Sequence, residues 1–207
     1  FDNLLLTFGS EIDSEEESTK ESAGLDFRSR GDGTCSLYGI GNCTDTDLII
    51  PTYSESGDKL VQIVSNAFSG SNITSVTIPD TVTHIRFSAF ENCTSLTDVY
   101  LGSGLVGLEQ SAFRGCTALE NINLPDSLTT MGTYCFRDCK SLVSVSIPDS
   151  VTAIGTYVFY GCSSLQDVTL GSGITAIRSV MFRECTSLES LVIPDGVTAI
   201  RQDAFRY

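Results

Sequence analysis

Apolar residues recur along most of this chain at a fixed interval of 23 residues. Each interval contains a phenylalanine, and in five of them a cysteine follows three residues later. A period of this length indicates a solenoid, because each unit can bury its apolar face only against its neighbours. The phenylalanines are Phe90, Phe113, Phe136, Phe159, Phe182 and Phe205, and the cysteines are Cys93, Cys116, Cys139, Cys162 and Cys185.

One unit, from residue 142 to residue 162, shows the elements that the pattern predicts. Alternation of Leu142, Val145 and Ile147 with polar residues predicts a short strand. The Pro-Asp pair at 148–149 predicts a turn, since proline cannot donate to a strand ladder. Residues 151–154 then form a second extended piece, and residues 159–162 a short turn of helix.

The chain divides into three parts. Residues 1–23 join an apolar stub to an acidic, serine-rich stretch that reads as a solvated linker. Residues 24–60 contain short strand patterns with Gly-rich turns, which suit an N-terminal β cap over the first coil. Residues 61–207 hold about six to seven coils. Because the chain begins at Phe1 and not at Met, we expect a mature or trimmed product.

The charge of the chain is strongly negative, with a formal net charge of −14. Nucleic acid is therefore a poor candidate partner, since binding to phosphates needs a basic surface. No apolar run approaches the roughly 20 residues that a transmembrane helix requires, so we expect no membrane span.

Cysteine is frequent, with eight in the chain, but five of the eight share one repeat position. Stacked coils would place these five in a column of buried, free thiols, because cysteine is a common small apolar core residue. This composition suits a reducing or anaerobic setting. Cys35 and Cys43 lie outside the array and could form a disulfide if they face each other across a hairpin. Cys135 most simply fills the core.

If the apolar residues of each strand point inward, the residues between them form an exposed strand face. Hydroxyl and amide groups with one aromatic ring, Tyr100, could bind a peptide strand or a sugar, and Tyr100 is the best single anchor. The alternative is ordinary solvated surface. The candidate ligand-binding residues are Asp98, Tyr100, Asn121, Asn123, Ser144, Ser146, Asp167 and Thr169; Ser75, Thr77, Ser190 and Val192 hold the same positions in the outer coils.

A second column follows the repeat phenylalanine and is rich in arginine. Like charges in adjacent coils repel unless something anionic meets them. The column could therefore mark an acidic partner, or the chain's own acidic tail at Glu15–Glu17. The alternative is a set of side chains whose aliphatic stems cover the core. The column consists of Glu91, Arg114, Arg137, Tyr160, Arg183 and Arg206.

Catalysis has little support in the sequence. The one histidine, His84, occupies a position that Thr or Ala fills in other coils, and no phosphate loop, nucleophile elbow or metal-ligand spacing occurs. The aspartates that follow proline in the turns are better explained as turn residues than as calcium ligands. We therefore expect no enzyme activity, catalytic residue, metal or cofactor.

One short motif lies outside the array. Arg30-Gly31-Asp32 spells an integrin-binding tripeptide and falls in an expected exposed turn. Three-residue matches often arise by chance, so the tripeptide alone carries little weight.

The repeat units, with Leu-x-x-Val-x-Ile-Pro-Asp-Ser-Val-Thr-x-Ile-Gly followed by Ala-Phe-x-x-Cys-x-Ser-Leu, resemble the BspA-like leucine-rich repeat family over about residues 61–207. Residues 32–51 also look like the leader found ahead of such repeats. The resemblance implies a leucine-rich repeat solenoid, right-handed and β-rich with short helical or 3-10 turns, a concave face lined by strands, and an N-terminal β-hairpin-like cap. It further implies surface adhesins, found widely in anaerobic gut and oral bacteria and in some protists.

Two functional hypotheses follow. The first is a non-catalytic module, adhesin-like, that recognises a protein or glycan through the concave face, at the surface of an anaerobic bacterium or secreted from it. The second is a structural subunit of an envelope layer, appendage or virion, tethered by residues 1–23, which would also suit a last coil without an obvious cap. No ligand is implied, because function in such arrays depends on variable side chains over a shared frame.

Overall fold

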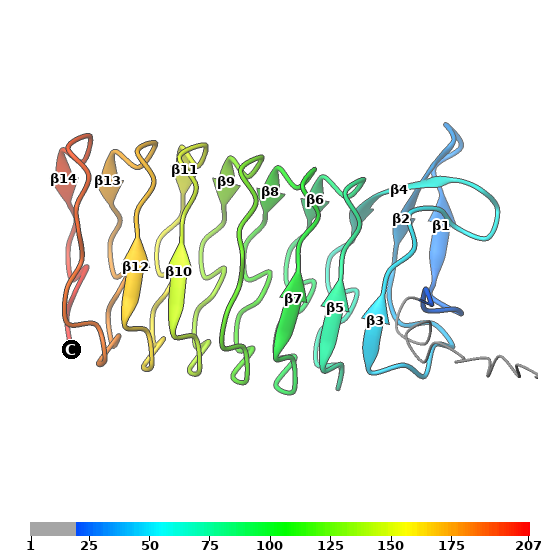
Figure 1. The fold of residues 1–207 in the computed structure, drawn as a ribbon, viewed down its shortest axis with the longest axis horizontal. Coiled ribbons are helices and arrows are strands. Elements are labelled where there is room, and N and C mark those ends of the chain that lie inside the picture. The colour runs from blue at the N-terminus through cyan, green and yellow to red at the C-terminus, as the bar shows by residue number, and fades with distance from the viewer. Residues whose placement is uncertain (1–19) are drawn as a thin grey trace, which may run out of the picture.

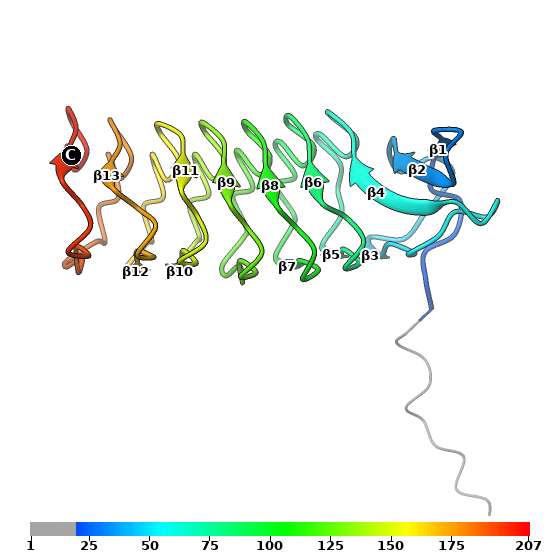
Figure 2. The same ribbon diagram turned by 90° about the horizontal axis from the view of Figure 1, so that it is seen from above.

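The computed structural model describes residues 20–207 of the 207-residue chain. These residues form a β-solenoid of about seven turns, in which successive coils stand side by side along one axis (Figures 1 and 2). The solenoid predicted from the 23-residue period is therefore confirmed. The expected apolar stub and most of the acidic linker lie outside the described residues.

Two columns of short strands run along the array (Figure 1). The first column lies in the lower half of the coils in that view, where parallel pairing joins β3 to β5 and β7, and β10 to β12. Isolated bridges add Asn121 beside Ser144 and Val192 beside Thr169. This column consists of β3 (Asp47–Ile49), β5 (Ser75–Thr77), β7 (Asp98–Tyr100), β10 (Ser144–Ser146) and β12 (Asp167–Thr169).

The second column lies in the upper half of the coils and corresponds to the second extended piece of each repeat. Most of it belongs to one seven-stranded sheet that begins with β1 (Phe27–Ser29) and β2 (Thr34–Leu37) of the cap, while the last two strands pair separately. The column consists of β4 (Lys59–Ile63), β6 (His84–Ile85), β8 (Gly107–Leu108), β9 (Thr130–Met131), β11 (Ala153–Ile154), β13 (Ala176–Ile177) and β14 (Ala199–Ile200).

The core between the two columns contains a stack of phenylalanine rings, one from each coil. The stack runs from Phe68 to Phe205, with neighbouring ring centroids 5.1 to 5.8 Å apart and the rings nearly parallel. Burying one such side chain contributes roughly 1.5–3 kcal/mol. Because each ring stacks on the rings of the neighbouring coils, contacts between neighbouring coils are a main source of the array's stability.

A turn surrounds each stacked phenylalanine, and no helix forms there or elsewhere in residues 20–207. The residue two before the phenylalanine has positive φ in every coil, as at Asn66 (φ 60) and Asp203 (φ 54). The residue two after it is also left-handed, as at Gly161 (φ 73). A run of right-handed helix cannot pass through such positions. The expected short turn is therefore present, without helical geometry.

The N-terminal end of the array is covered by the predicted β cap. β1 and β2 form an antiparallel hairpin, and β2 also pairs with β4, so the cap continues the second strand column. Ser22 is buried and exchanges two hydrogen bonds with Ile49, one through each backbone N–H. The cap therefore includes Ser22, two residues before the expected boundary at Gly24.

Candidate binding surface

The strand face is produced by the alternation seen in the sequence. In the first column the central residue of each strand is buried, as Val99, Val145 and Val168 show. Their neighbours point outward because successive side chains of a strand lie on opposite faces. The face is thus a direct consequence of the repeat, and its chemistry depends on the outward residues alone.

The eight predicted ligand-binding residues all lie on this face. Seven of them are exposed and Ser144 is half-buried, with its hydroxyl 3.4 Å from the side-chain oxygen of Asn121. The register places Ser144 beside Asp167 and Ser146 beside Thr169 in the neighbouring coil. The structure thus gathers these residues on one surface, while their role in binding stays a prediction.

Tyr100 stands out on this surface. Its side chain is 59% exposed, and the β5–β7 register places it beside Thr77. Tyrosine is enriched among the residues that dominate interface binding energy. Val192, at the same repeat position in a later coil, is 83% exposed.

Carboxylates accompany the strand face. They occupy the strands, the residues just before them and the turns just after them, and all are exposed. Within residues 61–207 no Lys or Arg occurs in the strands of this face or in the turns after them, and the exposed Lys140 lies in the turn before β10. Within the described residues none of these carboxylates forms an ion pair. The set consists of Asp80, Asp98, Glu120, Asp126, Asp149, Asp167, Glu189 and Asp195.

Two of these aspartates have a structural role in the turns. The Asp80 side chain accepts a hydrogen bond from the backbone N–H of Ser103 in the next coil, and Asp149 accepts one from Ser172, each at 2.6 Å. Hydrogen bonding from the backbone and side chain of Ser172 lowers the pKa of the Asp149 carboxyl. The expectation that the post-proline aspartates serve as turn residues agrees with this geometry.

The arginine column after each phenylalanine has a different electrostatic character. Arg114 pairs with Glu91 at 3.0 Å, Arg137 with Asp138 at 3.1 Å, and Arg206 with Asp203 at 3.8 Å. We call this column, together with the paired carboxylates beside it, the ion-paired edge. Its positive charges are met within the chain, which favours a role in covering the core over a role in binding an acidic partner.

Two further pairs complete the ion-paired edge. Arg183 lies 3.6 Å from Glu184, and Arg86 lies 2.5 Å from Glu109, which holds the same repeat position one coil later. These contacts were not predicted, although opposite charges one period apart in the sequence, as at Arg86 and Glu109, indicate such a pair.

Tyr160 occupies the edge position between two arginines. The guanidinium carbons of Arg137 and Arg183 lie 4.8 and 5.9 Å from its ring centroid, within the range of cation–π attraction. Its hydroxyl donates to the Glu184 carboxylate at 2.7 Å, and this hydrogen bond raises the pKa of Tyr160. The ring therefore lies between the arginines of the two adjacent coils and contacts both.

The cysteine ladder consists of buried free thiols, as predicted. Each thiol donates to the backbone carbonyl of the phenylalanine in the preceding coil, for example Cys139 to Phe113 at 3.2 Å. Burial raises the pKa of the ladder thiol Cys162 and raises that of Cys185 to about 12. Hydrogen bonding to the Cys116 side chain lowers the pKa of Cys93 at the start of the ladder, whereas the enclosed thiols of Cys162 and Cys185 stay protonated and are poor nucleophiles.

The three remaining cysteines are free as well. The Cys35 thiol is buried and faces the carbonyl of Asp58 at 3.3 Å, so the possible disulfide with Cys43 is not formed. Cys135 is fully buried beside the phenylalanine stack, in agreement with its expected role in filling the core.

His84, the only histidine, lies on β6 in the second strand column. Its Nδ1 atom is 3.0 Å from the Thr83 hydroxyl, its only side-chain hydrogen-bond partner in the described part of the chain. Over the same residues, no three His, Cys, Asp or Glu side chains come together as a metal site would require, and no helix is long and apolar enough to cross a membrane.

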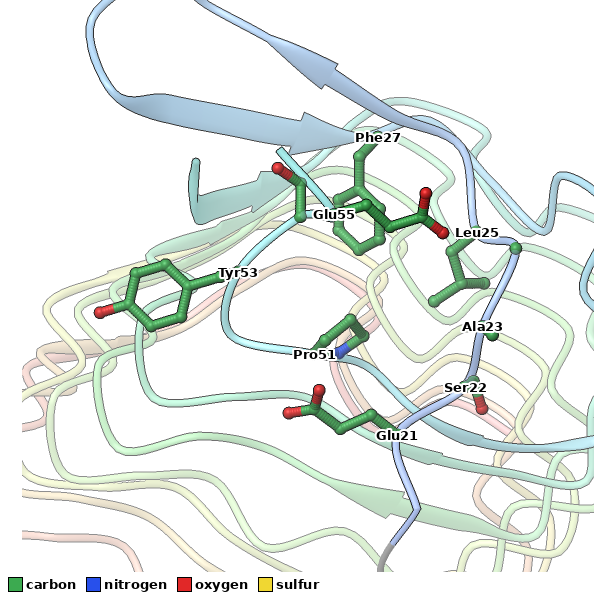
Figure 3. Close-up of a pocket in the computed structure, with 10 residues that line it drawn as sticks. Glu21, Ser22, Ala23, Leu25, Phe27, Pro51, Tyr53 and Glu55 are labelled. Carbon is green, nitrogen blue, oxygen red and sulfur yellow. The ribbon is translucent and has the colours of Figure 1, made fainter. Parts of the chain in front are cut away.

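The cap contains a hollow of about 290 Å³ that was not predicted from the sequence (Figure 3). Leu25, Phe27 and Pro51 provide apolar walls, and Glu21 and Glu55 lie at its border. Ligand sites for small molecules usually occupy about 300–1,000 Å³ and are more enclosed. The geometry of this hollow does not indicate a function.

The architecture has close counterparts among solved structures. A leucine-rich repeat protein of T. pallidum, TpLRR, superposes with a TM-score of 0.82 at 28% identity, covering 87% of this chain and 86% of its own. A leucine-rich repeat protein from Bacteroides ovatus superposes with a TM-score of 0.81, also at 28% identity, and covers 92% of this chain, which spans 50% of that protein. A leucine-rich repeat protein from Eubacterium ventriosum shares the fold at 20% identity, with a TM-score of 0.58 over 89% of this chain and 62% of its own.

No curated protein matches the chain. A model of the BspA type leucine-rich repeat region, in contrast, matches six copies over residues 50–142 and 89–207. Together these matches span the array that the stacked phenylalanines define. The chain therefore belongs to the BspA-type leucine-rich repeat family.

Proposed function

We propose that this protein is a non-catalytic recognition module that binds its partner through the strand face. The observation that supports this most is the state of the carboxylates there: they are exposed and lack ion pairs in the described residues, whereas those of the ion-paired edge are matched by arginine. Unpaired charge on a rigid, repeated surface is available to a partner.

The strand face also carries the other groups that recognition needs. Hydroxyls and amides offer directional hydrogen bonds, and Tyr100 offers a rigid amphipathic ring with few rotamers to fix on binding. Asn121 and Asn123 could bind the hydroxyls of a glycan or the backbone of a peptide. The acidic surroundings favour a protein partner that presents Lys or Arg over a neutral sugar.

An adhesin-like role at a bacterial cell surface is the setting we propose for this module. It is supported by the family, whose repeats are of a bacterial surface type, and by the bacterial origin of the similar solved structures. In this setting the partner is a protein or glycan displayed by a host or by another cell.

A binding screen tests the proposal. The full chain, the Tyr100→Ala variant and a chain lacking residues 1–19 are immobilised and exposed to a panel of cell-surface proteins and glycans. We expect capture of a partner by the full chain and by the shortened chain, weakened by Tyr100→Ala and by added salt. Capture that requires residues 1–19 and ignores Tyr100 would overturn the proposal in favour of a tethered structural subunit.

A further inference from the structure

The β1–β2 hairpin of the cap presents the tripeptide Arg30-Gly31-Asp32 at its tip. β1 ends at Ser29 and β2 begins at Thr34, so the tripeptide lies wholly in the connecting turn. In Figure 1 this turn extends past the upper edge of the coils, at the N-terminal end of the array. Its location on a protruding loop, away from the strand face, is typical of a binding loop on a rigid scaffold.

The turn is fully accessible. Arg30, Gly31, Asp32 and Gly33 are all exposed. Both glycines have positive φ, at +81° and +79°, and a Cβ added at either would meet nothing within 4 Å. A receptor could therefore approach the backbone of the tripeptide without displacing any part of this protein.

The two charges of the tripeptide remain available. The ion pair in this hairpin joins Arg28 to Asp26, and Arg30 takes part in no ion pair of the described residues. The Asp32 carboxylate uses one oxygen, Oδ1, to accept hydrogen bonds from the Thr34 N–H at 3.0 Å and the Thr34 hydroxyl at 2.5 Å. Its other oxygen is free to coordinate a cation, and these bonds lower the pKa of Asp32, so the group is ionised.

The shape of the turn is held by several contacts at its base. The Arg30 N–H donates to the Thr34 carbonyl at 2.8 Å, and the Gly31 N–H to the Ser29 hydroxyl at 3.2 Å. The Arg28 guanidinium lies 4.1 Å from the ring centroid of Tyr38, across the hairpin. A loop that is already ordered loses less conformational entropy on binding, which favours affinity.

We infer that this hairpin is a second binding site, which engages a receptor that holds the Asp32 carboxylate through a divalent cation and the Arg30 guanidinium through a carboxylate. Divalent cations prefer carboxylate oxygens, and guanidinium groups pair with carboxylates in a two-pronged geometry. Integrins that read Arg-Gly-Asp have this chemistry. The site is independent of the strand face, because the two surfaces share no residue.

The test measures binding of the full chain to purified ectodomains of Arg-Gly-Asp-reading integrins in buffer that contains Mg²⁺. We expect binding that EDTA abolishes and that a free Arg-Gly-Asp peptide displaces. Asp32→Glu, which moves the carboxylate by one methylene, should weaken binding about tenfold or more, and Arg30→Lys should weaken it as well.

Two controls separate this site from the strand face. Asp126→Glu makes the same chemical change on another exposed surface, and Tyr100→Ala removes the proposed anchor of the strand face; both should bind integrin as the unchanged chain does. All variants should keep the CD spectrum and melting temperature of the unchanged chain, since the altered side chains are exposed. Failure of the unchanged chain to bind, or equal binding by Asp32→Glu, would overturn the inference, and neither result bears on the strand face.

Discussion

The strand face and the ion-paired edge are built from the same repeat but treat charge in opposite ways. On the edge, Glu91, Glu109, Asp138, Glu184 and Asp203 each lie beside an arginine. The strands of the strand face and the turns after them carry no basic side chain in residues 61–207, although Lys140 is exposed in the turn before β10. The carboxylates there have no ion pair in the described part of the chain.

This difference indicates what each surface is for. Paired charges at the edge allow long side chains to cover the phenylalanine stack without repulsion between coils. The unpaired carboxylates on the strand face do not cover the phenylalanine stack, and they repel one another only weakly through water. An array can carry such a surface at little cost in stability, and we interpret it as a surface available to a partner.

The largest expected effect comes from the core that both surfaces share. Phe136 stacks between Phe113 and Phe159, at 5.6 and 5.8 Å, and Phe136→Ala should lower the free energy of unfolding by about 3–5 kcal/mol. Urea denaturation followed by CD measures the loss. A loss below about 1 kcal/mol would mean that the array does not depend on its ring stack.

Alkaline pH should have the next largest effect on stability, because it removes protons from the buried thiols of the cysteine ladder. Burial raises the pKa of Cys185 from 9.0 to about 12, and it also raises the pKa of Cys139 and Cys162. These thiols stay protonated in the folded chain while the unfolded chain loses their protons, so stability is complete below about pH 9 and falls as pH rises toward 12. Melting temperatures from pH 8 to pH 11 in the presence of a reductant measure this decline.

The matched variant for the alkaline effect is Cys185→Ala. It removes one of the titrating groups and should make the decline with pH shallower, even if it lowers stability at pH 8. An identical pH slope in the two proteins would show that the buried thiols are not its source.

Removal of the aromatic anchor should act on binding alone. Tyr100→Ala should weaken capture of the strand-face partner about tenfold or more, equivalent to about 1.4 kcal/mol. The side chain is 59% exposed, so the melting temperature should stay close to that of the unchanged chain. Surface plasmon resonance and thermal melts measure the two effects, and a fall in stability without a fall in affinity would assign Tyr100 to the fold.

The smallest effect compares one carboxylate from each surface. Glu91 is paired with Arg114 and its side chain is 19% exposed, so Glu91→Gln should cost about 0.5–1 kcal/mol of stability at low salt. Asp126 has no ion pair in the described residues, and Asp126→Asn should change stability by less than about 0.5 kcal/mol. Equal costs in urea titrations of both variants would remove the distinction between the surfaces.

Much of the fold was predictable because the repeat encodes it. The 23-residue period located the stacked phenylalanines and the free cysteine ladder, and strict alternation around Val145 separated buried from exposed positions. The local shape of the turns was less accessible. Positive φ is expected at Asn66 and Gly161, but the same geometry occurs at Val180 (φ 61), where the neighbouring coils override the preference of a β-branched residue.

The candidate site was predictable in composition and only partly in electrostatics. The outward residues of the strand face follow from alternation. The arginine column suggested an anionic partner because the carboxylates that pair with each arginine were not taken into account. Pairs such as Arg137–Asp138 and the position of Tyr160 between arginines depend on side-chain conformations. A sequence gives no direct access to these, except where opposite charges fall one period apart.

The most direct test of the central claim compares the two surfaces in one binding experiment. The partner captured by the full chain is titrated against a strand-face variant carrying Asp98→Asn, Glu120→Gln and Asp167→Asn, and against the edge variant Arg137→Ala. We expect the strand-face variant to lose about tenfold or more in affinity, together with most of its sensitivity to salt, while the edge variant binds as the unchanged chain does. Loss of binding in the edge variant with full affinity in the strand-face variant would show that the partner binds at the ion-paired edge.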